Sequence, residues 1–413
     1  MVQPAPARTS FPKSEISVLL LENIHASADE LFGPEGWRIE RASSALKEGE
    51  LIERIRDVHV LGIRSKTHVT PAVLAEARRL LAVGAFCIGT NQIACDAAAR
   101  AGVPVWNAPY SNTRSVAEMV LAEIVFLARQ LGDRVREVHA GKWRKVSAGC
   151  REVRGKTLGI VGYGHIGTQV GVLAEAFGMR VLYYDIAPKL AVGNVRPTAD
   201  LFELLGASDF VTLHVPETPL TRGMIDRAAL AAMRPGGYLI NASRGTVVDV
   251  DALADAIRAG RCAGAAIDVF PEEPEGASDD FRSPLRGLPN VILTPHIGGS
   301  TEEAQENIGR EVAASLVRFV NTGTTTGAVN FPVVELAQVP GAHRILNIHK
   351  NVPGVLRDIN RIVSDRGANI RAQQLATDAD IGYLVMDLDQ DVSDDVKRDV
   401  AALPTSVKTR ILY

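Results

Sequence analysis

The sequence predicts an α/β fold with two parallel-sheet domains and a smaller C-terminal module. Short apolar strand patterns alternate with helical patterns from Ile16 onward, and the alternation starts again near Lys156, which indicates two parallel sheets covered by helices. From residue 343 to residue 413 the pattern order is strand, helix, strand, strand, helix, strand, which is the ferredoxin-like arrangement.

Composition describes an ordinary globular protein and excludes several function classes. The chain has 413 residues, 46% of them hydrophobic and 23% charged, with a net charge of −3. A protein with this charge balance has no strong positive electrostatic field that would attract nucleic acid or an anionic membrane. No apolar run approaches the ~18 residues of a membrane span. Residues 1–15 are rich in Pro and Ala and are predicted to be a disordered tail rather than a targeting segment.

The four cysteines indicate neither a disulfide scaffold nor a metal site. Cys87, Cys95, Cys150 and Cys262 are scattered without C-x-x-C spacing. We expect reduced thiols in a cytoplasmic protein without a structural metal.

The first series has strand patterns separated by helical patterns, followed by a longer helix. Ser115 and Glu118 have the spacing of a capping box ahead of a helix predicted over residues 116–130. The strands are predicted at 16–23, 58–65, 80–89 and 103–109, and the helices at 45–57 and 71–79.

The second series begins with a dinucleotide-binding pattern. The strand over 157–161 runs into G-x-G-x-x-G, formed by Gly162, Gly164 and Gly167, and a helix follows. Such glycines permit a tight turn, a close approach of pyrophosphate and close packing of helix on strand. A second strand ends at Asp185, whose carboxylate can accept both ribose hydroxyls of NAD and would repel the 2′-phosphate of NADP. Lys189 lies near enough in sequence to leave NADP open.

Three polar residues follow later strands of this series and suggest hydride-transfer chemistry. Arg244, Glu273 and His296 come after the strand patterns 236–243, 264–270 and 291–296. Ligands of open α/β sheets bind at the carboxyl ends of strands, so these side chains are expected to converge. A guanidinium can hold a substrate carboxylate, an imidazole can pass the hydroxyl proton, and a carboxylate can orient the imidazole.

Asp268 is unusual because it stands within an apolar run. A buried carboxylate needs partners, which a nicotinamide carboxamide or a backbone cap can supply equally well. Residues 302–321 read as another long helix, and residues 322–342 are rich in Thr, Gly and Pro and read as a connecting segment.

Several of these segments resemble the signature segments of the D-isomer-specific 2-hydroxyacid dehydrogenases. The closest matches are INASRGTVVD, GAAIDVFPEEP and TPHIGGST. RSKTHVT, FCIGTNQI, NAPYSNTRSVAE, GYGHIG and QENIG, with the C-terminal module, are similar to the branch that oxidises D-3-phosphoglycerate to 3-phosphohydroxypyruvate with NAD, the first step of L-serine synthesis. Some bacterial members of this branch also reduce 2-oxoglutarate.

The resemblance implies a domain plan and a homotetramer. It implies that each parallel sheet belongs to a Rossmann-like or flavodoxin-like domain and that the C-terminal module is an ACT domain. The implied plan is a substrate-binding domain at 16–112 with 300–332, an NAD-binding Rossmann domain at 113–299, a linker at 333–342 and the ACT domain at 343–413.

The resemblance also implies site residues. The catalytic set falls on Arg244, Glu273 and His296. The implied NAD contacts are Gly162, Gly164, His165, Ile166, Gly167, Asp185, Ala242, Ser243, Arg244, Asp268, His296, Gly298 and Gly299. The implied substrate contacts are Arg64, Ser65, Lys66, Asn112 and Lys145, with Lys66 standing where close relatives often carry Arg and Lys145 acting across a subunit boundary in one reading.

The resemblance also implies that the C-terminal module regulates the enzyme. His349, Asn351, Gly354 and Asn369 match positions that bind L-serine as a feedback inhibitor. Gly341 is the one hinge glycine of the linker where relatives carry a pair, and Gly298 with Gly299 is a second candidate hinge. Two other functions stay open from the residues: an NAD-sensing scaffold or co-repressor on the same fold, and a dehydrogenase for another 2-hydroxy acid such as glycerate.

Overall fold

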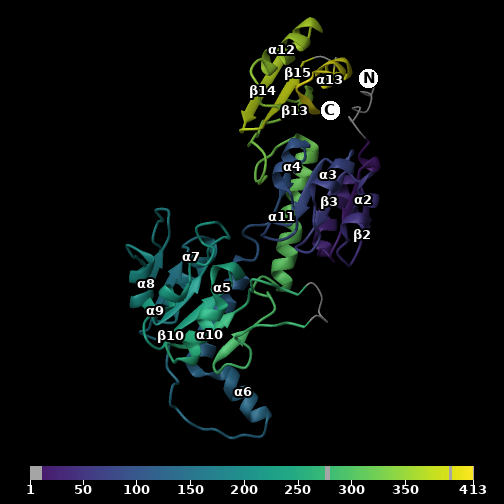
Figure 1. The fold of residues 1–413 in the computed structure, drawn as a ribbon. Coiled ribbons are helices and arrows are strands. Elements are labelled where there is room, and N and C mark those ends of the chain that lie inside the picture. Colours follow the sequence, from purple (N-terminus) through teal and green to yellow (C-terminus); the bar gives the residue numbers. More distant parts are fainter. Residues whose placement is uncertain (1–11, 275–279, 390–392, 413) are drawn as a thin grey trace, which may run out of the picture. The chain divides into compact units, whose positions relative to one another are not determined.

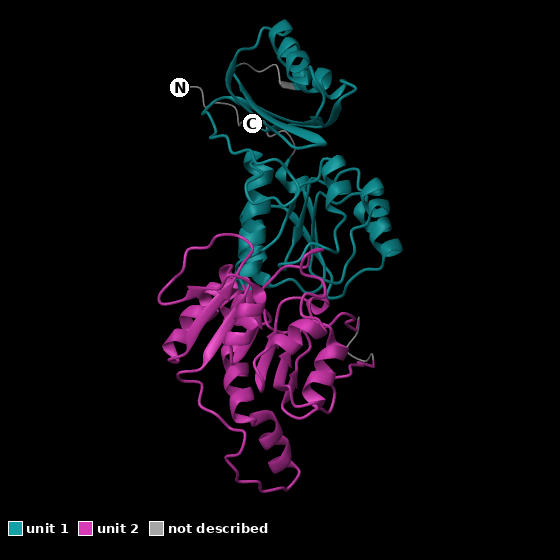
Figure 2. Ribbon diagram, turned by 60° about the vertical axis from the view of Figure 1, so that its left-hand side comes forward, with its two compact units in different colours: residues 1–111, 305–413 teal, residues 112–304 magenta. Residues whose placement is uncertain are grey.

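The computed structural model describes residues 12–274, 280–389 and 393–412 (Figure 1). Contacts between Cα atoms divide the chain into two compact units (Figure 2). The first unit joins residues 1–111 to residues 305–413, and the second comprises residues 112–304.

The first unit contains a five-stranded parallel sheet in the order β2-β1-β3-β4-β5. Its elements are η1 (Lys13–Glu15), β1 (Ser17–Leu20), η2 (Ala26–Ala28), α1 (Asp29–Phe32), η3 (Gly33–Glu35), β2 (Arg38–Arg41), α2 (Glu48–Ile55), β3 (Val60–Ile63), α3 (Pro71–Glu76), β4 (Ala82–Ala85), α4 (Cys95–Arg100), β5 (Val105–Trp106) and α11 (Glu302–Thr322).

Both faces of this sheet are buried, which explains the continuous apolar strand patterns. Side chains alternate along β1, so Val18 packs with Val312 and Leu316 of α11 while Leu19 packs with Leu51 and other residues of the opposite face. The long helix predicted at 302–321 is confirmed as α11.

The second unit contains a seven-stranded parallel sheet in the order β12-β11-β10-β9-β6-β7-β8. Its elements are α5 (Thr113–Arg129), α6 (Leu131–His139), β6 (Thr157–Val161), α7 (His165–Ala176), β7 (Arg180–Tyr184), β8 (Arg196–Pro197), α8 (Leu201–Ala207), β9 (Phe210–Leu213), α9 (Arg227–Ala232), β10 (Gly237–Asn241), η4 (Gly245–Val247), α10 (Val250–Arg258), β11 (Cys262–Ile267) and β12 (Val291–Leu293).

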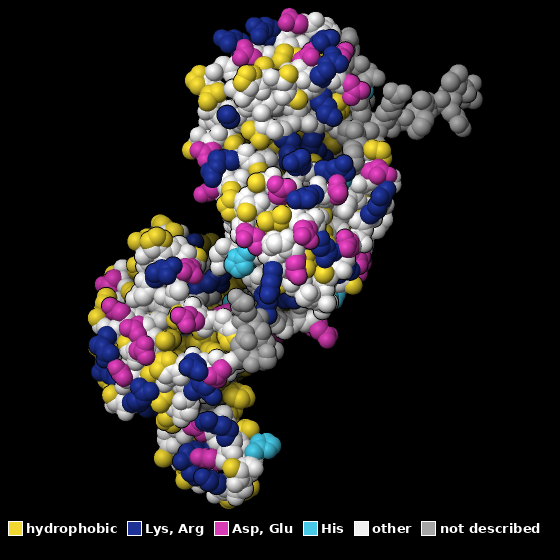
Figure 3. Space-filling view, turned by 45° about the vertical axis from the view of Figure 1, so that its right-hand side comes forward, with side chains coloured by type: hydrophobic (Ala, Val, Ile, Leu, Met, Phe, Trp, Pro, Cys, Tyr) yellow, Lys and Arg dark blue, Asp and Glu magenta, His cyan; other side chains and the backbone are white. Residues whose placement is uncertain are grey.

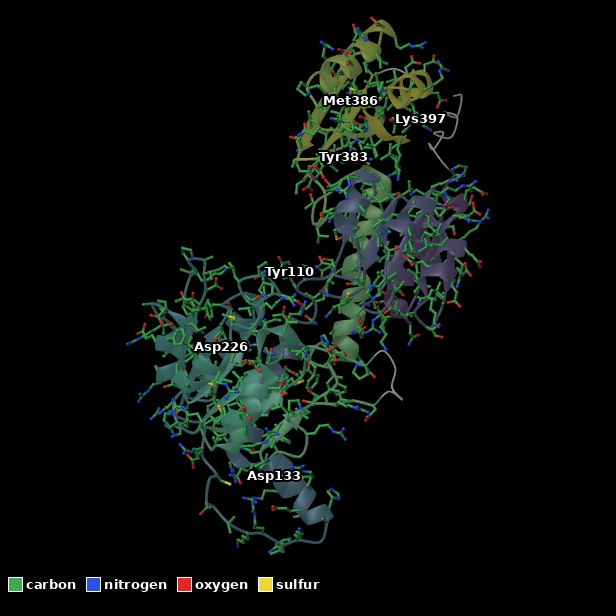
Figure 4. The ribbon with its side chains drawn as sticks, in the orientation of Figure 1. Tyr110, Asp133, Asp226, Tyr383, Met386 and Lys397 are labelled. Carbon is green, nitrogen blue, oxygen red and sulfur yellow. The ribbon has the colours of Figure 1, made fainter. Side chains whose placement is uncertain are left out.

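The strand order reverses between β6 and β9, which is the Rossmann topology and places a switch point at the carboxyl ends of these two strands. Helices α5 and α7 share a core with one face of the sheet. Helices α9 and α10 share a core with the other face, where Asp226 caps α9 by accepting a 2.8 Å hydrogen bond from Ala229 N (Figure 4).

The C-terminal part of the first unit is a four-stranded antiparallel sheet in the order β14-β15-β13-β16, as the ferredoxin-like pattern predicts. Its elements are β13 (His343–Lys350), α12 (Val355–Asp365), β14 (Ile370–Thr377), β15 (Ile381–Leu388), α13 (Ser393–Ala401) and β16 (Ser406–Leu412).

One face of this sheet packs on α12 and α13, and its other face belongs to the core that contains α11. Tyr383 of β15 (Figure 4) donates a 2.5 Å hydrogen bond to Gly323 O. The buried Lys408 Nζ donates to Leu80 O at 2.7 Å. These contacts explain why residues 343–413 cluster with the first unit.

The predicted capping box is wrong, because α5 begins at Thr113, before Ser115. Ser115 lies inside the first turn and its hydroxyl bonds to Thr301 Oγ1 at 2.8 Å. Glu118 pairs with Arg114 at 2.6 Å on the helix surface instead of reaching back to the backbone. Because Ser115 lies inside the helix, its hydroxyl cannot cap the helix N-terminus, and it contacts a residue distant in sequence instead.

At the N-terminus, residues 1–11 of the predicted tail lie outside the described residues, and Lys13–Glu15 form η1. No helix among the described residues is both long and apolar enough to cross a membrane. Acidic and basic side chains are interspersed on the visible face (Figure 3), in line with the small net charge. The four cysteines all lie in the described part of the chain, and none forms a disulfide there.

Candidate active site

The glycine-rich turn lies at the switch point of the second sheet. Gly162 follows β6 with a left-handed φ of 91°, and a Cβ there would lie 2.5 Å from His214 O, at the end of β9. A Cβ at Gly167 would lie 2.3 Å from Gly162 O. Only glycine fits at both positions, so the turn brings the N-terminus of α7 against the strand ends.

This turn fits the pyrophosphate of a dinucleotide. A Cβ at Gly164, the residue that precedes α7, would meet no atom of the described residues within 4 Å. The backbone at Gly164 therefore borders open space at the start of α7, where a phosphate can approach.

Asp185 lies where the ribose of such a dinucleotide is expected. Its Oδ2 accepts a 2.9 Å hydrogen bond from Tyr163 N, and its Oδ1 accepts one of 2.9 Å from Ala187 N. The two bonds hold the carboxylate beside the glycine turn, in a surface pocket that Lys189 and Thr198 also line. Each carboxylate oxygen keeps a further lone pair for a ribose hydroxyl.

His296 and Glu273, which were expected to lie together from the sequence, form a hydrogen-bonded pair. His296 Nδ1 lies 2.8 Å from Glu273 Oε2 and 3.1 Å from Glu273 Oε1. Glu273 Oε1 also accepts a 3.1 Å hydrogen bond from Phe270 N, which orients the carboxylate. Since Nδ1 is occupied by Glu273, the Nε2 atom of His296 is the one left for a substrate proton.

The pKa values of His296 and Glu273 move in opposite directions. The hydrogen bond to Glu273 raises the pKa of His296, against an opposing effect of partial burial. Burial by itself would raise the pKa of Glu273, but hydrogen bonds from His296 and Phe270 N hold it below its ordinary value. The positive charge of Arg244 contributes a smaller lowering of both pKa values, so it acts on the same site.

Arg244 is placed by a close contact between two loops. It follows β10, and Gly245 beside it is packed so tightly that a Cβ would lie 1.9 Å from the carbonyl carbon of Phe270. The carbonyl oxygen of Arg244 accepts a 3.0 Å hydrogen bond from Asn241 Nδ2. The Nη1 atom of the Arg244 side chain donates a hydrogen bond to Ser243 O at 2.7 Å. The guanidinium is thereby held at the same sheet edge as Glu273.

Asp268 anchors the loop that carries His296, and it lies directly after β11 rather than within the strand. Its Oδ1 accepts hydrogen bonds from Thr294 Oγ1 at 2.6 Å and Ile297 N at 2.9 Å, and its Oδ2 accepts one from Gly298 N at 2.8 Å. The residue is 1% exposed. The structure thus provides backbone donors for Asp268.

The anchored loop also has a strained backbone at His296. His296 has a left-handed φ of 55°, and its N–H bonds to Asp268 O at 2.8 Å. Gly299, three residues on, packs against the buried Asn112, because a Cβ at Gly299 would lie 2.2 Å from Asn112 Nδ2. The second unit therefore brings together Arg244, Glu273, His296, Asp268, Gly298, Gly299 and Asn112.

The other predicted substrate contacts belong to two further segments of the chain. Arg64, Ser65 and Lys66 follow β3 in the first unit, and Lys145 lies in the exposed segment after α6 in the second unit. His349 is 3% exposed at the end of β13, with Nδ1 3.0 Å from Asn347 Oδ1, and burial lowers its pKa.

The other predicted effector residues surround α12. Asn351 donates to Asp378 O at 2.6 Å, and Asn369 N donates to Asp389 Oδ1 at 2.9 Å. Gly354 precedes α12 with a left-handed φ of 96°.

Sequence reasoning missed two polar residues that shape these loops. Thr294 holds Asp268, and Glu22 binds the backbone of residues 64–67. The sequence offered a signal for Glu22, because a carboxylate next to an apolar strand pattern needs a polar partner. Glu22 interrupts the apolar run LLLEN in the way that Asp268 interrupts GAAIDVF.

Two family models match the chain. Residues 121–298 match the model described as D-isomer specific 2-hydroxyacid dehydrogenase, NAD binding domain. Residues 345–408 match the model described as AHAS small subunit-like ACT domain.

Two solved structures of 2-hydroxyacid dehydrogenases share this fold at 25% and 28% sequence identity. A D-lactate dehydrogenase from Aquifex aeolicus, complexed with NAD and lactic acid, superposes with a TM-score of 0.67 at 28% identity, covering 76% of this chain and 99% of that one. An NAD-complexed D-isomer specific 2-hydroxyacid dehydrogenase from Lactobacillus delbrueckii gives 0.68 at 25% identity, covering 76% and 100%.

Curated relatives match over nearly the full length. A D-3-phosphoglycerate dehydrogenase of Dictyostelium discoideum is 55% identical over 405 residues, covering 98% of this chain and 99% of the relative. One of Escherichia coli K12 is 50% identical over 410 residues, covering 98% and 100%. The chain belongs to the D-3-phosphoglycerate dehydrogenases, within the D-isomer specific 2-hydroxyacid dehydrogenase family.

Proposed function

We propose that this protein oxidises D-3-phosphoglycerate to 3-phosphohydroxypyruvate with NAD, the first step of L-serine biosynthesis. The hydrogen-bonded pair of His296 and Glu273 carries this proposal, because it lies on the sheet edge that also carries the dinucleotide turn and Arg244. The identity to the curated relatives supports the choice of substrate.

Each residue of the site has a separate role in the proposed reaction. Bound NAD supplies the hydride acceptor. Arg244 pairs with the substrate carboxylate, and His296 Nε2 accepts the proton of the C2 hydroxyl while the C2 hydrogen leaves as hydride. Glu273 stabilises the imidazolium that results, and Asp268 keeps the His296 loop in place.

Arg64, Ser65, Lys66, Asn112 and Lys145 are proposed to bind the anionic groups of the substrate. A phosphorylated substrate needs such a basic set in a chain whose net charge is −3. The test is NAD reduction with D-3-phosphoglycerate, D-glycerate and L-lactate in parallel, with the oxo product trapped and identified. We expect rapid reduction only with D-3-phosphoglycerate; equal rates with D-glycerate would assign another substrate.

Replacing Glu273 with Gln is expected to shift the pH dependence of the reverse reaction. Reduction of the oxo acid needs protonated His296, so its rate falls as pH rises through the His296 pKa, which Glu273 raises. A neutral amide stabilises the imidazolium less, so this limb should move about one pH unit lower. Rates of NADH consumption against pH measure it. Glu272→Gln is the control, and an unchanged limb in Glu273→Gln would contradict the pairing.

The C-terminal module is proposed to bind L-serine as a feedback inhibitor. The match of residues 345–408 to an ACT domain supports an amino-acid effector, with His349, Asn351, Gly354 and Asn369 as its contacts. Initial rates with and without L-serine test the regulation, and Asn369→Ala should relieve it. Turnover that ignores serine would leave the module a role in assembly.

The assembly is proposed to be a cytoplasmic homotetramer. Apolar side chains on α5, α6 and the segment that follows α6 support contact between copies, since Trp143 is 84% exposed and Val135 and Val138 are about half exposed. Light scattering after gel filtration measures the mass in solution. A monomer would overturn both the tetramer and the suggestion that Lys145 acts across a subunit boundary.

A further inference from the structure

Glu22 occupies a position that is costly for its residue type. It follows β1 with a left-handed φ of 60°, a conformation unfavourable for a residue with a side chain. Its side chain is acidic, yet the residue is only 8% exposed. A buried carboxylate in a strained backbone persists only where its surroundings hold it in place.

What holds Glu22 is the backbone of the loop after β3. Oε1 accepts hydrogen bonds from Arg64 N at 3.1 Å and Thr67 N at 2.8 Å, and Oε2 accepts one from Lys66 N at 2.9 Å. Three amides of one turn thus point at one carboxylate, which is the arrangement that such turns offer to a bound anion.

The same loop is held from its other side by Gln92. Its Nε2 donates a 2.6 Å hydrogen bond to Arg64 O, and the residue is 7% exposed. The backbone of residues 64–67 is therefore fixed both through its amides and through a carbonyl. The side chains of Arg64, Ser65 and Lys66 start from a backbone that cannot turn freely.

We propose that Glu22 is a positioning residue for substrate phosphate. The inference rests on the proposed function, in which Arg64, Ser65 and Lys66 bind that phosphate. Because the Glu22 carboxylate already occupies the amides of Arg64, Lys66 and Thr67, a second anion cannot use these three donors. The phosphate is left mainly to the side chains of this loop, whose directions Glu22 sets through the backbone.

The matched variants are Glu22→Gly, Glu22→Gln and Asn23→Gly. Glycine at position 22 removes the carboxylate and also relieves the left-handed strain, so misfolding from strain is avoided. Glutamine keeps the size but sets an amide donor against backbone donors. Asn23, with a φ of 53°, gives the control in which strain is relieved at the neighbouring position and the carboxylate remains.

The readout is KM against kcat for 3-phosphohydroxypyruvate and for hydroxypyruvate, with NADH affinity and melting temperature measured on the same samples. Both Glu22 variants should raise KM for the phosphorylated substrate by about tenfold to a hundredfold, with kcat changed less than about threefold. The KM for hydroxypyruvate, NADH affinity and the Asn23→Gly control should change little. In Glu22→Gly, added acetate should restore part of the lost affinity by occupying the empty amides.

Two results would overturn the inference. One is an unchanged KM for the phosphorylated substrate in both Glu22 variants. The other is an equal rise for both substrates, which would make Glu22 a general support of the fold. A wild-type enzyme without preference for the phosphorylated substrate would instead overturn the proposed function, and this is established before any variant is compared.

Discussion

Replacement of His296 by Ala is expected to lower kcat by about a thousandfold while NADH still binds, because general acid–base catalysis by one side chain contributes on this scale. The imidazole is the proposed acid–base group, and its Nδ1 lies 2.8 Å from Glu273 Oε2. The dinucleotide turn at Gly162 and Gly167 is built on β6 and α7, which this change does not touch.

A second variant separates chemistry from loop distortion. His296 has a φ of 55°, and alanine is unfavourable there, whereas asparagine tolerates that conformation. His296→Asn should therefore keep the loop that Asp268 anchors and still lose turnover. His139→Ala, at an exposed position on α6, is the control. Turnover that survives in His296→Asn would remove His296 from the mechanism.

Replacement of Glu123 by Gln is expected to stabilise the protein, increasingly so as pH rises. Glu123 lies on α5, 6% exposed, and neither carboxyl oxygen has a hydrogen-bond partner among the described residues. Burial, with a smaller contribution from the charge of Asp268, raises its pKa to about 8. A carboxyl group with few compensating contacts thus has to keep its proton in the folded state at neutral pH.

The direction of this effect follows from proton linkage. Between the unfolded pKa near 4.5 and the folded pKa near 8, the folded state binds one proton more than the unfolded state, so stability falls with rising pH. From pH 5 to pH 8 the loss from this group is about 3 kcal/mol, and glutamine removes it. Urea unfolding at both pH values measures the difference between wild type and variant.

The control for this comparison is Glu118→Gln on the exposed side of the same helix. It should follow the wild-type pH dependence of unfolding. If the difference between Glu123→Gln and wild type does not grow with pH, Glu123 has a compensating partner in solution and the raised pKa is wrong.

The parts of this structure that sequence predicted best depend on local geometry. The turn at Gly162 and Gly167 needs glycine because the neighbouring backbone leaves no room for a Cβ. The glycine pattern in the sequence therefore predicts the turn directly. The antiparallel C-terminal sheet followed from strand patterns separated by tight turns. Arg244, Glu273 and His296 converge because parallel strands end on one edge.

The parts that sequence could not predict depend on contacts between distant segments. Ser115 had the spacing of a cap, but Thr301 takes its hydroxyl, from 186 positions away. Asp268 was recognised as needing partners, yet only the structure identifies Thr294, Ile297 and Gly298. Glu22 reaches amides more than 40 positions away, and no short pattern encodes such a pairing.

The measurement that tests the central claim most directly is NADH consumption by the wild-type protein with 3-phosphohydroxypyruvate, hydroxypyruvate and 2-oxoglutarate in parallel. The account predicts fast turnover of 3-phosphohydroxypyruvate, slow turnover of hydroxypyruvate, and at most a secondary activity on 2-oxoglutarate. NADH binding without turnover of any of the three would contradict it, and would favour an NAD-sensing scaffold built on the same fold.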